Sequence, residues 1–287
     1  MYKIAILGCE NSHANSFLNH VKDTDYKNEI EFVGVYSNEE EPAKKLSEEF
    51  GVYAAKSYDE FVGKVDAIII TARHGDNHYK YAKPYIASGI PMFIDKPITC
   101  TEEDAKAFRK ELEENNIKIF GGSMCVFADL IQELKKAVEE NKYGKAIGGY
   151  LRAPLLGDSP YGGFYFYAQH LVQVMTEIYG CYPKSVVATE KNKNITCIVR
   201  YEDFDVNLSY VNDNFNYYAG VSFEEKFVGD NYIVDDCFPA EFENFYNLIS
   251  KGEQRLSYDD FFAPVYILNA IDRALKSGKE EKINYEG

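Results

Sequence analysis

Phe93-Ile94-Asp95-Lys96-Pro97 is the stretch of this sequence that decides the fold. It closes a short apolar run and places a lysine directly before a proline. In an open α/β sheet, ligands bind in the crevice outside the carboxyl ends of the strands. A lysine at that edge of a sheet is therefore well placed to contact a ligand, and the sequence on both sides favours such a sheet.

The sequence before and after this stretch alternates strands with helices. Strands are expected at 3–7, 31–36, 67–71, 91–94 and 117–120, and helices at 12–21, 40–50, 77–88 and 101–115. Thr101-Glu102-Glu103-Asp104 has the pattern of a capping box, and so does Ser57-Tyr58-Asp59-Glu60, for which we expect a short helix. Continuous apolar runs such as Ala67-Ile68-Ile69-Ile70 suit a parallel sheet that is covered on both faces. The pattern predicts a doubly wound, Rossmann-type α/β domain over residues 1–121.

The pattern changes after Gly121-Gly122. Helices are expected at 129–140, 168–179, 240–251 and 258–277, and strands at 146–152, 185–190, 195–201, 205–211, 219–223 and 225–228. Successive strands with short turns indicate an open, mainly antiparallel sheet. We therefore expect residues 122–287 to form an α+β domain for substrate binding and oligomerisation, with the last helix as a candidate to pack back on the first domain.

Composition excludes several classes of function. The 287 residues include 46 acidic and 31 basic side chains, for a net charge of −15. Nucleic acids and anionic membrane surfaces attract basic patches, so neither is an expected partner. The sequence begins directly with a strand and has no apolar run of membrane-spanning length, and its six cysteines form no Cys-x-x-Cys pair. These features predict a cytoplasmic protein with free thiols.

The turn after the first strand is where a dinucleotide would bind. In Gly8-Cys9-Glu10-Asn11-Ser12-His13, only Gly8 matches the Gly-x-Gly-x-x-Gly fingerprint. The second glycine of that fingerprint lets the backbone approach a pyrophosphate closely, and Glu10 adds bulk and negative charge there. Backbone N–H groups at a helix N-terminus remain available to an anion. The turn predicts weakened dinucleotide binding.

The end of the second strand indicates which nicotinamide cofactor would bind. Dinucleotide folds usually carry an acid there for the ribose hydroxyls, and this chain offers Ser37 or Asn38. The following residues, Glu39-Glu40-Glu41, would repel a 2′-phosphate, although a solvated first helical turn explains them equally well. The sequence therefore favours NAD over NADP.

Glu10 and His13 also allow a metal hypothesis. Glu-x-x-His spacing would put both side chains on one face of a helical turn, where His74, His78 or His170 could complete a metal site. The alternative is that Ser12 caps the helix and His13 fills the space of the third glycine. Our interpretation assigns no metal ligands.

Three motifs resemble those of the glucose-fructose oxidoreductase, inositol dehydrogenase and MocA family. Asp95-Lys96-Pro97 resembles its Glu-Lys-Pro motif, and residues 161–170 resemble its Gly-Gly…Asp-x-Gly-x-His segment. His170 falls on the motif histidine, while Phe166 and Ala168 stand at the aspartate and glycine positions. The loop at residues 71–78 is similar to Thr-Pro-Asn-x-x-His, with His78 on the motif histidine. The resemblance spans nearly the whole chain.

This resemblance implies an NAD(P)-dependent oxidoreductase that transfers hydride between nicotinamide and a hydroxyl carbon of a sugar, cyclitol or related polyol. It also implies a homodimer or homotetramer packed through the C-terminal sheet. The implied catalytic residues are Lys96 and His170, with the histidine as general base, a task that suits a group titrating near neutrality. Gln173 or Glu177 could orient His170, because helical spacing brings them near its face.

The remaining candidates follow from the motifs and from the Tyr-rich segment, since tyrosine rings stack on C–H groups and their hydroxyls form hydrogen bonds. Candidates for cofactor binding are Gly8, Glu10, Asn11, Ser12, His13, Ser37, Asn38, Thr71, Arg73, His78, Asp95 and Lys96. Candidates for substrate binding are Lys96, Arg152, Tyr161, Tyr165, Tyr167 and His170. Two alternative functions stay open: a cofactor-free or non-catalytic sugar sensor on the same fold, and a metal-dependent enzyme that uses Glu10 and His13.

Overall fold

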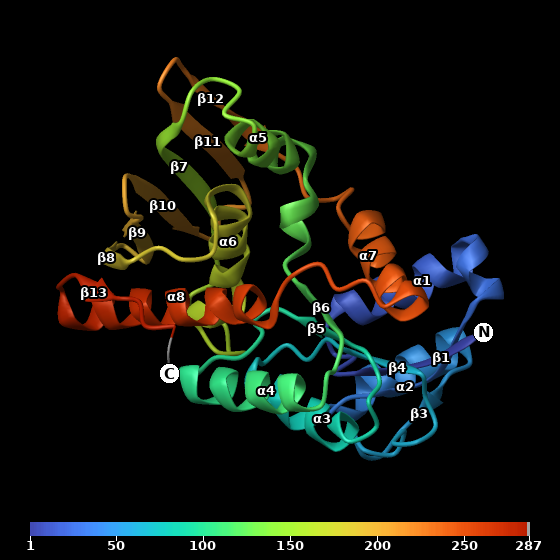
Figure 1. Ribbon diagram of the computed structural model, residues 1–287. Helices are drawn as coiled ribbons and strands as arrows, with labels where there is room; N and C mark the ends of the chain where they lie inside the picture. The colour runs from blue at the N-terminus through green and yellow to red at the C-terminus, as the bar shows by residue number, and fades with distance from the viewer. Residues whose placement is uncertain (286–287) are drawn as a thin grey trace. The chain divides into compact units, whose positions relative to one another are not determined.

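A computed structural model describes residues 1–285, and the chain divides into two units (Figure 1). Six parallel strands form the sheet of the first unit. This unit contains Met1–Thr99, Glu103–Gly121 and Phe238–Tyr258. Its strands are β1 (Tyr2–Leu7), β2 (Ile30–Tyr36), β3 (Tyr53–Ala54), β4 (Ala67–Ile70), β5 (Met92–Asp95) and β6 (Ile119–Gly122). Their order, β3-β2-β1-β4-β5-β6, is that of a dinucleotide-binding sheet, with the reversal of strand order between β1 and β4.

Continuous apolar runs explain why these strands are central. All four residues of β4 and the first three of β5 have no exposed surface. Each fully buried Val, Leu, Ile or Phe side chain contributes about 1.5–3 kcal/mol relative to an exposed one. The predicted parallel sheet covered on both faces is therefore confirmed.

Helices flank this sheet. They are α1 (Ser12–Asp23), α2 (Glu40–Phe50), α3 (Asp76–Ile86), α4 (Glu102–Glu114) and α7 (Phe238–Lys251), together with a 3₁₀ turn, η1 (Asp25–Asn28). Helix α7 comes from the far end of the chain and packs on α1, because the Phe17 ring lies 6.0 Å from that of Phe242 and 6.1 Å from that of Phe245. This packing attaches a late segment of the sequence to the first unit.

The expected short helix at Ser57-Tyr58-Asp59-Glu60 is wrong. The segment forms turns instead, and the Glu60 carboxylate accepts hydrogen bonds from the backbone N–H groups of Lys56 at 2.5 Å and Ser57 at 2.9 Å. The glutamate thus makes the reciprocal bond of a capping box, but Gly63 follows with φ of 72° and no helix continues. A capping pattern without an amphipathic run behind it gives only a turn.

The second unit is built on a seven-stranded sheet and contains Cys100–Glu102, Gly122–Cys237 and the chain from Asp259 onward. Its strands are β7 (Ala146–Leu155), β8 (Ser185–Lys191), β9 (Asn194–Arg200), β10 (Asp205–Asn212), β11 (Tyr217–Phe223), β12 (Phe227–Tyr232) and β13 (Glu281–Lys282), in the order β12-β11-β7-β10-β9-β8-β13. The sheet is mainly antiparallel, as predicted, but β10 pairs with β7 in parallel, with Val206 opposite Gly149.

Helices α5 (Asp129–Glu139), α6 (Phe164–Tyr179), α8 (Tyr258–Ser277) and a 3₁₀ turn, η2 (Met124–Phe127), complete this unit. Helix α6 lies against β7 and β10 (Figure 1), where the Tyr210 hydroxyl donates to the Ala168 carbonyl at 3.2 Å. It begins four residues before the expected start at Ala168, so that Tyr165, Phe166 and Tyr167 are helical. All six cysteines are free thiols, and none of the helices in residues 1–285 combines the length and apolarity needed to cross a membrane.

Candidate functional site

The turn between β1 and α1 is shaped by Gly8 and Asn11. Gly8 has φ of 87°, and a Cβ atom there would lie 2.3 Å from the Ala72 Cα, so only glycine fits. The helix is capped by Asn11, whose side chain accepts from the His13 N–H at 3.3 Å. The alternative in which Ser12 caps α1 is therefore wrong, because the helix already begins at Ser12, one residue earlier than that role requires.

Glu10 bridges three loops at the carboxyl edge of the first sheet. Its Oε2 accepts from the Ser37 hydroxyl at 2.9 Å and its Oε1 accepts from the Arg73 backbone N–H at 3.1 Å. The glutamate lies before the first residue of α1, so the expected shared helical face of Glu10 and His13 does not form. The structure gives the two residues different partners.

Two hollows lie along this edge of the sheet. The first, of about 940 Å³, is lined by the candidates Glu10, Asn11, Ser12 and Arg73. The second, of about 700 Å³, is lined by Ser37 and Asn38, and Lys44 and Glu48 line both. The residues present fit a dinucleotide, because the first hollow meets the N-terminus of α1, where backbone N–H groups favour a pyrophosphate, and the second meets the end of β2.

Thr71 and His78 hold the loop after β4 in place through hydrogen bonds made inside the first unit. The Thr71 hydroxyl donates to the Gly8 carbonyl at 3.1 Å, and the His78 Nε2 lies 2.8 Å from the Ala72 carbonyl oxygen. Neither side chain has exposed surface, and burial lowers the pKa of His78. Both candidates therefore hold the Gly8–Ala72 contact together from inside the unit.

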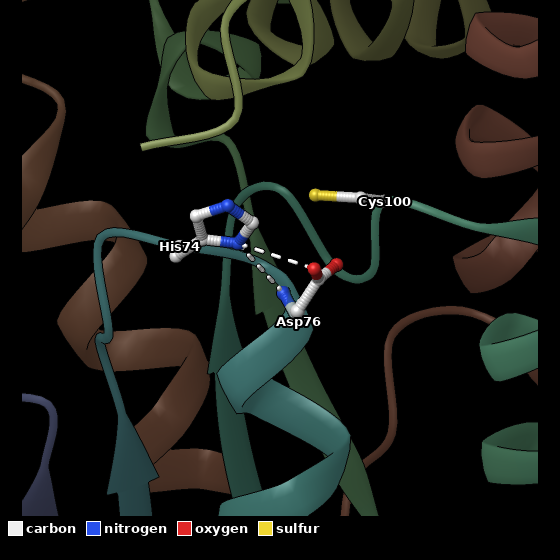
Figure 2. Close-up of side chains that lie close together, drawn as sticks. All are labelled: His74, Asp76 and Cys100. Carbon is white, nitrogen blue, oxygen red and sulfur yellow. Dashed lines mark hydrogen bonds and ion pairs between the residues drawn. The ribbon is translucent and has the colours of Figure 1, made fainter. Parts of the chain in front are cut away.

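His74 pairs with Asp76 at the start of α3. Figure 2 shows the imidazole Nδ1 facing this carboxylate, 3.6 Å away, and accepting from the Asp76 backbone N–H at 3.4 Å. Both side chains are partly exposed, at 34% for His74 and 56% for Asp76. The pair shapes the helix start in the same loop as Arg73.

A buried ionic cluster lies beneath the turn. Asp95, which ends β5, has no exposed surface and accepts from the Lys96 backbone N–H at 2.7 Å and from the Asn11 side chain at 3.2 Å. Its Oδ2 also lies 2.9 Å from the His13 Nδ1. The other ring nitrogen of His13 lies 3.4 Å from the Glu241 Oε2. His13 thus stands between two buried carboxyl groups.

The three groups shift one another's titration. Burial alone would lower the pKa of His13, but Asp95 and Glu241 outweigh it and raise the pKa to about 9. Burial opposes the charged form of Asp95 as well, but His13 and Lys96 hold its pKa well below its ordinary range. Burial raises the pKa of Glu241 to about 8. Near neutral pH the cluster therefore holds an ionised Asp95, a protonated His13 and a largely neutral Glu241.

Sequence reasoning missed Glu241. The residue lies in the first turn of α7, on the helix face that carries Phe238, Phe242 and Phe245. A glutamate inside an apolar stripe is the signal that could have found it, because such a residue is rarely buried without a partner.

His170 is held by residues that follow β6. Its Nδ1 lies 2.6 Å from the Ser123 hydroxyl and 3.4 Å from the Cys125 Sγ. The Cys125 backbone N–H donates to Ser123 at 3.2 Å, which fixes the hydroxyl oxygen in place. His170 is 8% exposed, and its ring forms a T-shaped pair with the Tyr167 ring, with the ring centroids 4.6 Å apart.

The residues expected to orient His170 have other partners. Gln173 accepts from the Gln169 side chain at 2.9 Å, and Glu177 accepts from Lys135 at 2.9 Å. Ser123 takes the expected role at Nδ1 instead. Its sequence signal is weak, since it is one serine after Gly121-Gly122, far from His170 along the chain.

The tyrosine candidates divide between two faces of α6. The Tyr167 hydroxyl lies 3.1 Å from that of Tyr217, on the side of His170. The Tyr165 hydroxyl donates instead to Asn269 of α8 at 3.2 Å. Residues two apart on a helix point in nearly opposite directions, so Tyr165 does not share the environment of His170. Tyr161 lies in the turns before α6, with its ring 5.7 Å from that of Phe166.

Arg152 lies on the other face of the second sheet. Its guanidinium donates to the Asn216 carbonyl and, at 2.8 Å, to the Asn214 side chain, and it lines an open hollow of about 470 Å³ with Tyr150 and Tyr218. Its neighbours Leu151 and Ala153 are buried on the α6 side, and successive side chains of a strand alternate between faces. Strand alternation therefore separates Arg152 from His170.

Residues 2–122 match a known family, described as an oxidoreductase family with an NAD-binding Rossmann fold and designated Gfo/Idh/MocA. The match covers β1 to β6 of the first unit, including the turn at Gly8 and the Asp95-Lys96-Pro97 segment. No curated protein sequence is similar enough to the chain to count as a match.

Solved structures share the fold over almost the full chain. Myo-inositol 2-dehydrogenase from Lactobacillus plantarum has a TM-score of 0.86 at 16% identity, covering 99% of both chains. A myo-inositol dehydrogenase from Corynebacterium glutamicum has a TM-score of 0.84 at 16% identity, again covering 99% of both chains. Scyllo-inositol dehydrogenase from Lactobacillus casei, solved with NAD(H) and scyllo-inositol, has a TM-score of 0.85 at 15% identity, with 99% of each chain covered.

Proposed function

We propose that this protein is an NAD-dependent dehydrogenase of a polyol. The premise is that residues 2–122 belong to the Gfo/Idh/MocA oxidoreductase family, with its NAD-binding Rossmann fold. The observation that carries the proposal is that family match, over a unit whose hollows run along the carboxyl edges of β1 and β2. The reaction would transfer hydride between nicotinamide and a hydroxyl carbon.

The first unit would hold the cofactor. The pyrophosphate would meet the N-terminus of α1 at Asn11 and Ser12, and the adenosine ribose would meet Ser37. When bound, the nicotinamide ring accepts or supplies the hydride. Thr71 and His78 keep the floor of this site in place through their bonds to the Gly8 and Ala72 carbonyl groups.

His170 would serve as the general base. Hydride can leave an alcohol carbon only if the hydroxyl proton also leaves, and an imidazole that titrates near neutrality suits that task. If Nδ1 donates its proton to the Ser123 oxygen, Nε2 is the basic nitrogen that takes the substrate proton. Lys96, at the carboxyl end of β5, would polarise the same oxygen as it gains negative charge.

The substrate would be a sugar, cyclitol or related polyol. The ring of Tyr167 beside His170 offers an apolar face for C–H groups and a hydroxyl tip for hydrogen bonds. The related folds include enzymes named for myo-inositol and scyllo-inositol, which makes cyclitols the first compounds to test. Tyr161 is a further candidate for the substrate wall.

Titration of the purified protein with NADH, followed by nicotinamide fluorescence, tests the cofactor assignment. We expect saturable binding at micromolar concentration, and then reduction of NAD by a polyol from a screened set. Lys96→Met should abolish turnover. Lys64→Met, which removes an exposed lysine of the same unit, should leave both turnover and NADH binding unchanged. Absence of binding to both NADH and NADPH would refute the proposed function.

A non-catalytic sugar sensor is the second candidate. Phe166 stands where the family motif has an aspartate, and its ring packs near Tyr161 and Tyr167, so no carboxylate occupies that position. Sugar binding by calorimetry without any NADH binding would select this function.

We also propose that the protein self-associates through the open face of the second sheet. Phe227 is 51% exposed and Tyr150 is 39% exposed, and both lie on the face opposite α6 near Gly220. Such a face is typically covered by a partner. Light scattering should give the mass of a homodimer or homotetramer, and Phe227→Glu should reduce that mass to the mass of one chain.

A further inference from the structure

We propose that Glu10, in the turn after β1, is the acid that binds the adenosine ribose hydroxyls and rejects a 2′-phosphate. Dinucleotide folds usually place that acid at the end of the second strand, where this chain has Ser37. The inference rests on the proposed function, since it concerns how the same cleft selects NAD over NADP.

The hydrogen bond between Glu10 and Ser37 carries the inference. The Glu10 Oε2 lies 2.9 Å from the Ser37 hydroxyl, so a side chain from the first turn delivers its carboxylate to the end of β2. The Ser37 oxygen also accepts from the Glu39 backbone N–H at 3.0 Å, which leaves the hydroxyl proton to point at Glu10. The pair supplies the negative charge that a serine alone lacks.

The carboxylate has capacity for further donors. An ionised carboxylate offers about four lone-pair sites, and the bonds from Ser37 and Arg73 use one on each oxygen. Glu10 lines the larger hollow, while Ser37 lines the neighbouring one. A vicinal diol placed between these two residues could therefore donate to the carboxylate.

Burial distinguishes Glu10 from the other acids of the cleft. Glu10 is 6% exposed, whereas Glu39 and Glu41 are exposed to solvent, which screens their charges. A buried carboxylate is screened much less, so Glu10 repels a 2′-phosphate more strongly than Glu39 or Glu41 does. The same residue that departs from the glycine fingerprint thereby becomes the residue that selects NAD.

The experiment compares NADH and NADPH dissociation constants, measured by nicotinamide fluorescence, for the wild-type protein and Glu10→Gln. We expect the wild type to prefer NADH, and Glu10→Gln to reduce that preference by about tenfold or more, the size expected for a lost charge-assisted hydrogen bond. Glu49→Gln removes the same charge from an exposed residue of α2 that lines neither hollow, and it should leave the preference within about twofold. The double variant Glu10→Gln with Ser37→Asp restores an acid at the end of β2 and should recover the preference.

Thermal unfolding shows whether Glu10→Gln still folds, and Ser37→Ala serves as the second test if it does not. Ser37→Ala removes the partner of Glu10 and should reduce the preference by about three- to tenfold. An unchanged preference in the folded variants would overturn the role of Glu10 while leaving the proposed function intact. Equal binding of NADH and NADPH by the wild-type protein would also overturn the role of Glu10 alone. A wild-type protein that binds neither dinucleotide would overturn both the role of Glu10 and the proposed function.

Discussion

His13 and Asp95 form a partly buried ion pair, 2.9 Å apart, at the position where a dinucleotide fingerprint has its third glycine. That glycine normally allows a helix to pack closely on a strand. Here an imidazole fills the space and bonds to the carboxylate that precedes Lys96. The departure from the fingerprint therefore joins the cofactor turn to the end of β5.

The pH dependence of stability should report this ion pair. The pKa of His13 is raised to about 9, above the value of an unfolded histidine, so its contribution is fully present below about pH 6.5 and is lost as the pH rises through about 9. His13→Gln should lower the free energy of unfolding by about 1–3 kcal/mol at pH 6, because it leaves Asp95 without its cation. Urea unfolding at several pH values measures the difference.

His20→Gln is the matched control for His13→Gln. His20 lies on the same helix, but its ring packs on those of Phe238 and Phe242, and burial lowers its pKa. The difference in free energy of unfolding between wild type and His13→Gln should shrink at alkaline pH. The difference between wild type and His20→Gln should not shrink. A His13→Gln deficit of equal size at about pH 6 and pH 9.5 would contradict the ion-pair account.

Glu241 should make the protein less stable as the pH rises, whereas a salt-bridged carboxylate makes a protein more stable. Burial raises its pKa to about 8, so the unfolded state ionises first and stability falls as the pH rises from about 4.5 to 8. Glu241→Gln removes this titrating group, so the free energy of unfolding should fall less between those pH values, by an amount on the order of a few kcal/mol. The measurement is again the free energy of unfolding against pH. Glu243→Gln, an exposed neighbour, should follow the wild-type curve, and a Glu241→Gln curve parallel to wild type would refute the assignment.

Ser123 should act as a positioning residue for His170. The Ser123 hydroxyl lies 2.6 Å from the His170 Nδ1, and removing it frees the ring to change tautomer. Ser123→Ala should lower kcat by about tenfold with little change in KM, and it should shift the pH profile of kcat. Thr176→Val is the control. It removes another buried hydroxyl, on the same helix as His170, which donates to the Gln173 carbonyl at 3.0 Å. An equal effect from both variants would assign Ser123 a role in stability alone.

The fold followed from local patterns, because the strands that decide it are apolar on both faces. β4 and β5 could be read directly, and Asp95-Lys96-Pro97 marked the correct edge of the sheet. The two-residue strand β3 and the parallel pairing of β10 with β7 could not be read, because strand partners depend on tertiary contacts.

The candidate site was harder to predict for the same physical reason. The contacts of Ser123 with His170 and of Glu241 with His13 join residues far apart along the chain. No period or spacing encodes such pairs. Glu10 was visible as a departure from a motif, but its hydrogen bond to Ser37 across the sheet edge was not.

The early start of α6 leads to a last prediction about two tyrosines. Tyr167 packs on His170 with its hydroxyl 3.1 Å from that of Tyr217, while the Tyr165 hydroxyl bonds to Asn269. Tyr167→Phe should raise KM for the polyol by about three- to tenfold, because it removes one hydroxyl beside the base. Tyr165→Phe should leave KM unchanged and lower the free energy of unfolding by about 1 kcal/mol. Steady-state kinetics and urea unfolding of both variants decide the matter, and a raised KM in Tyr165→Phe alone would show that the substrate meets the opposite face of the helix.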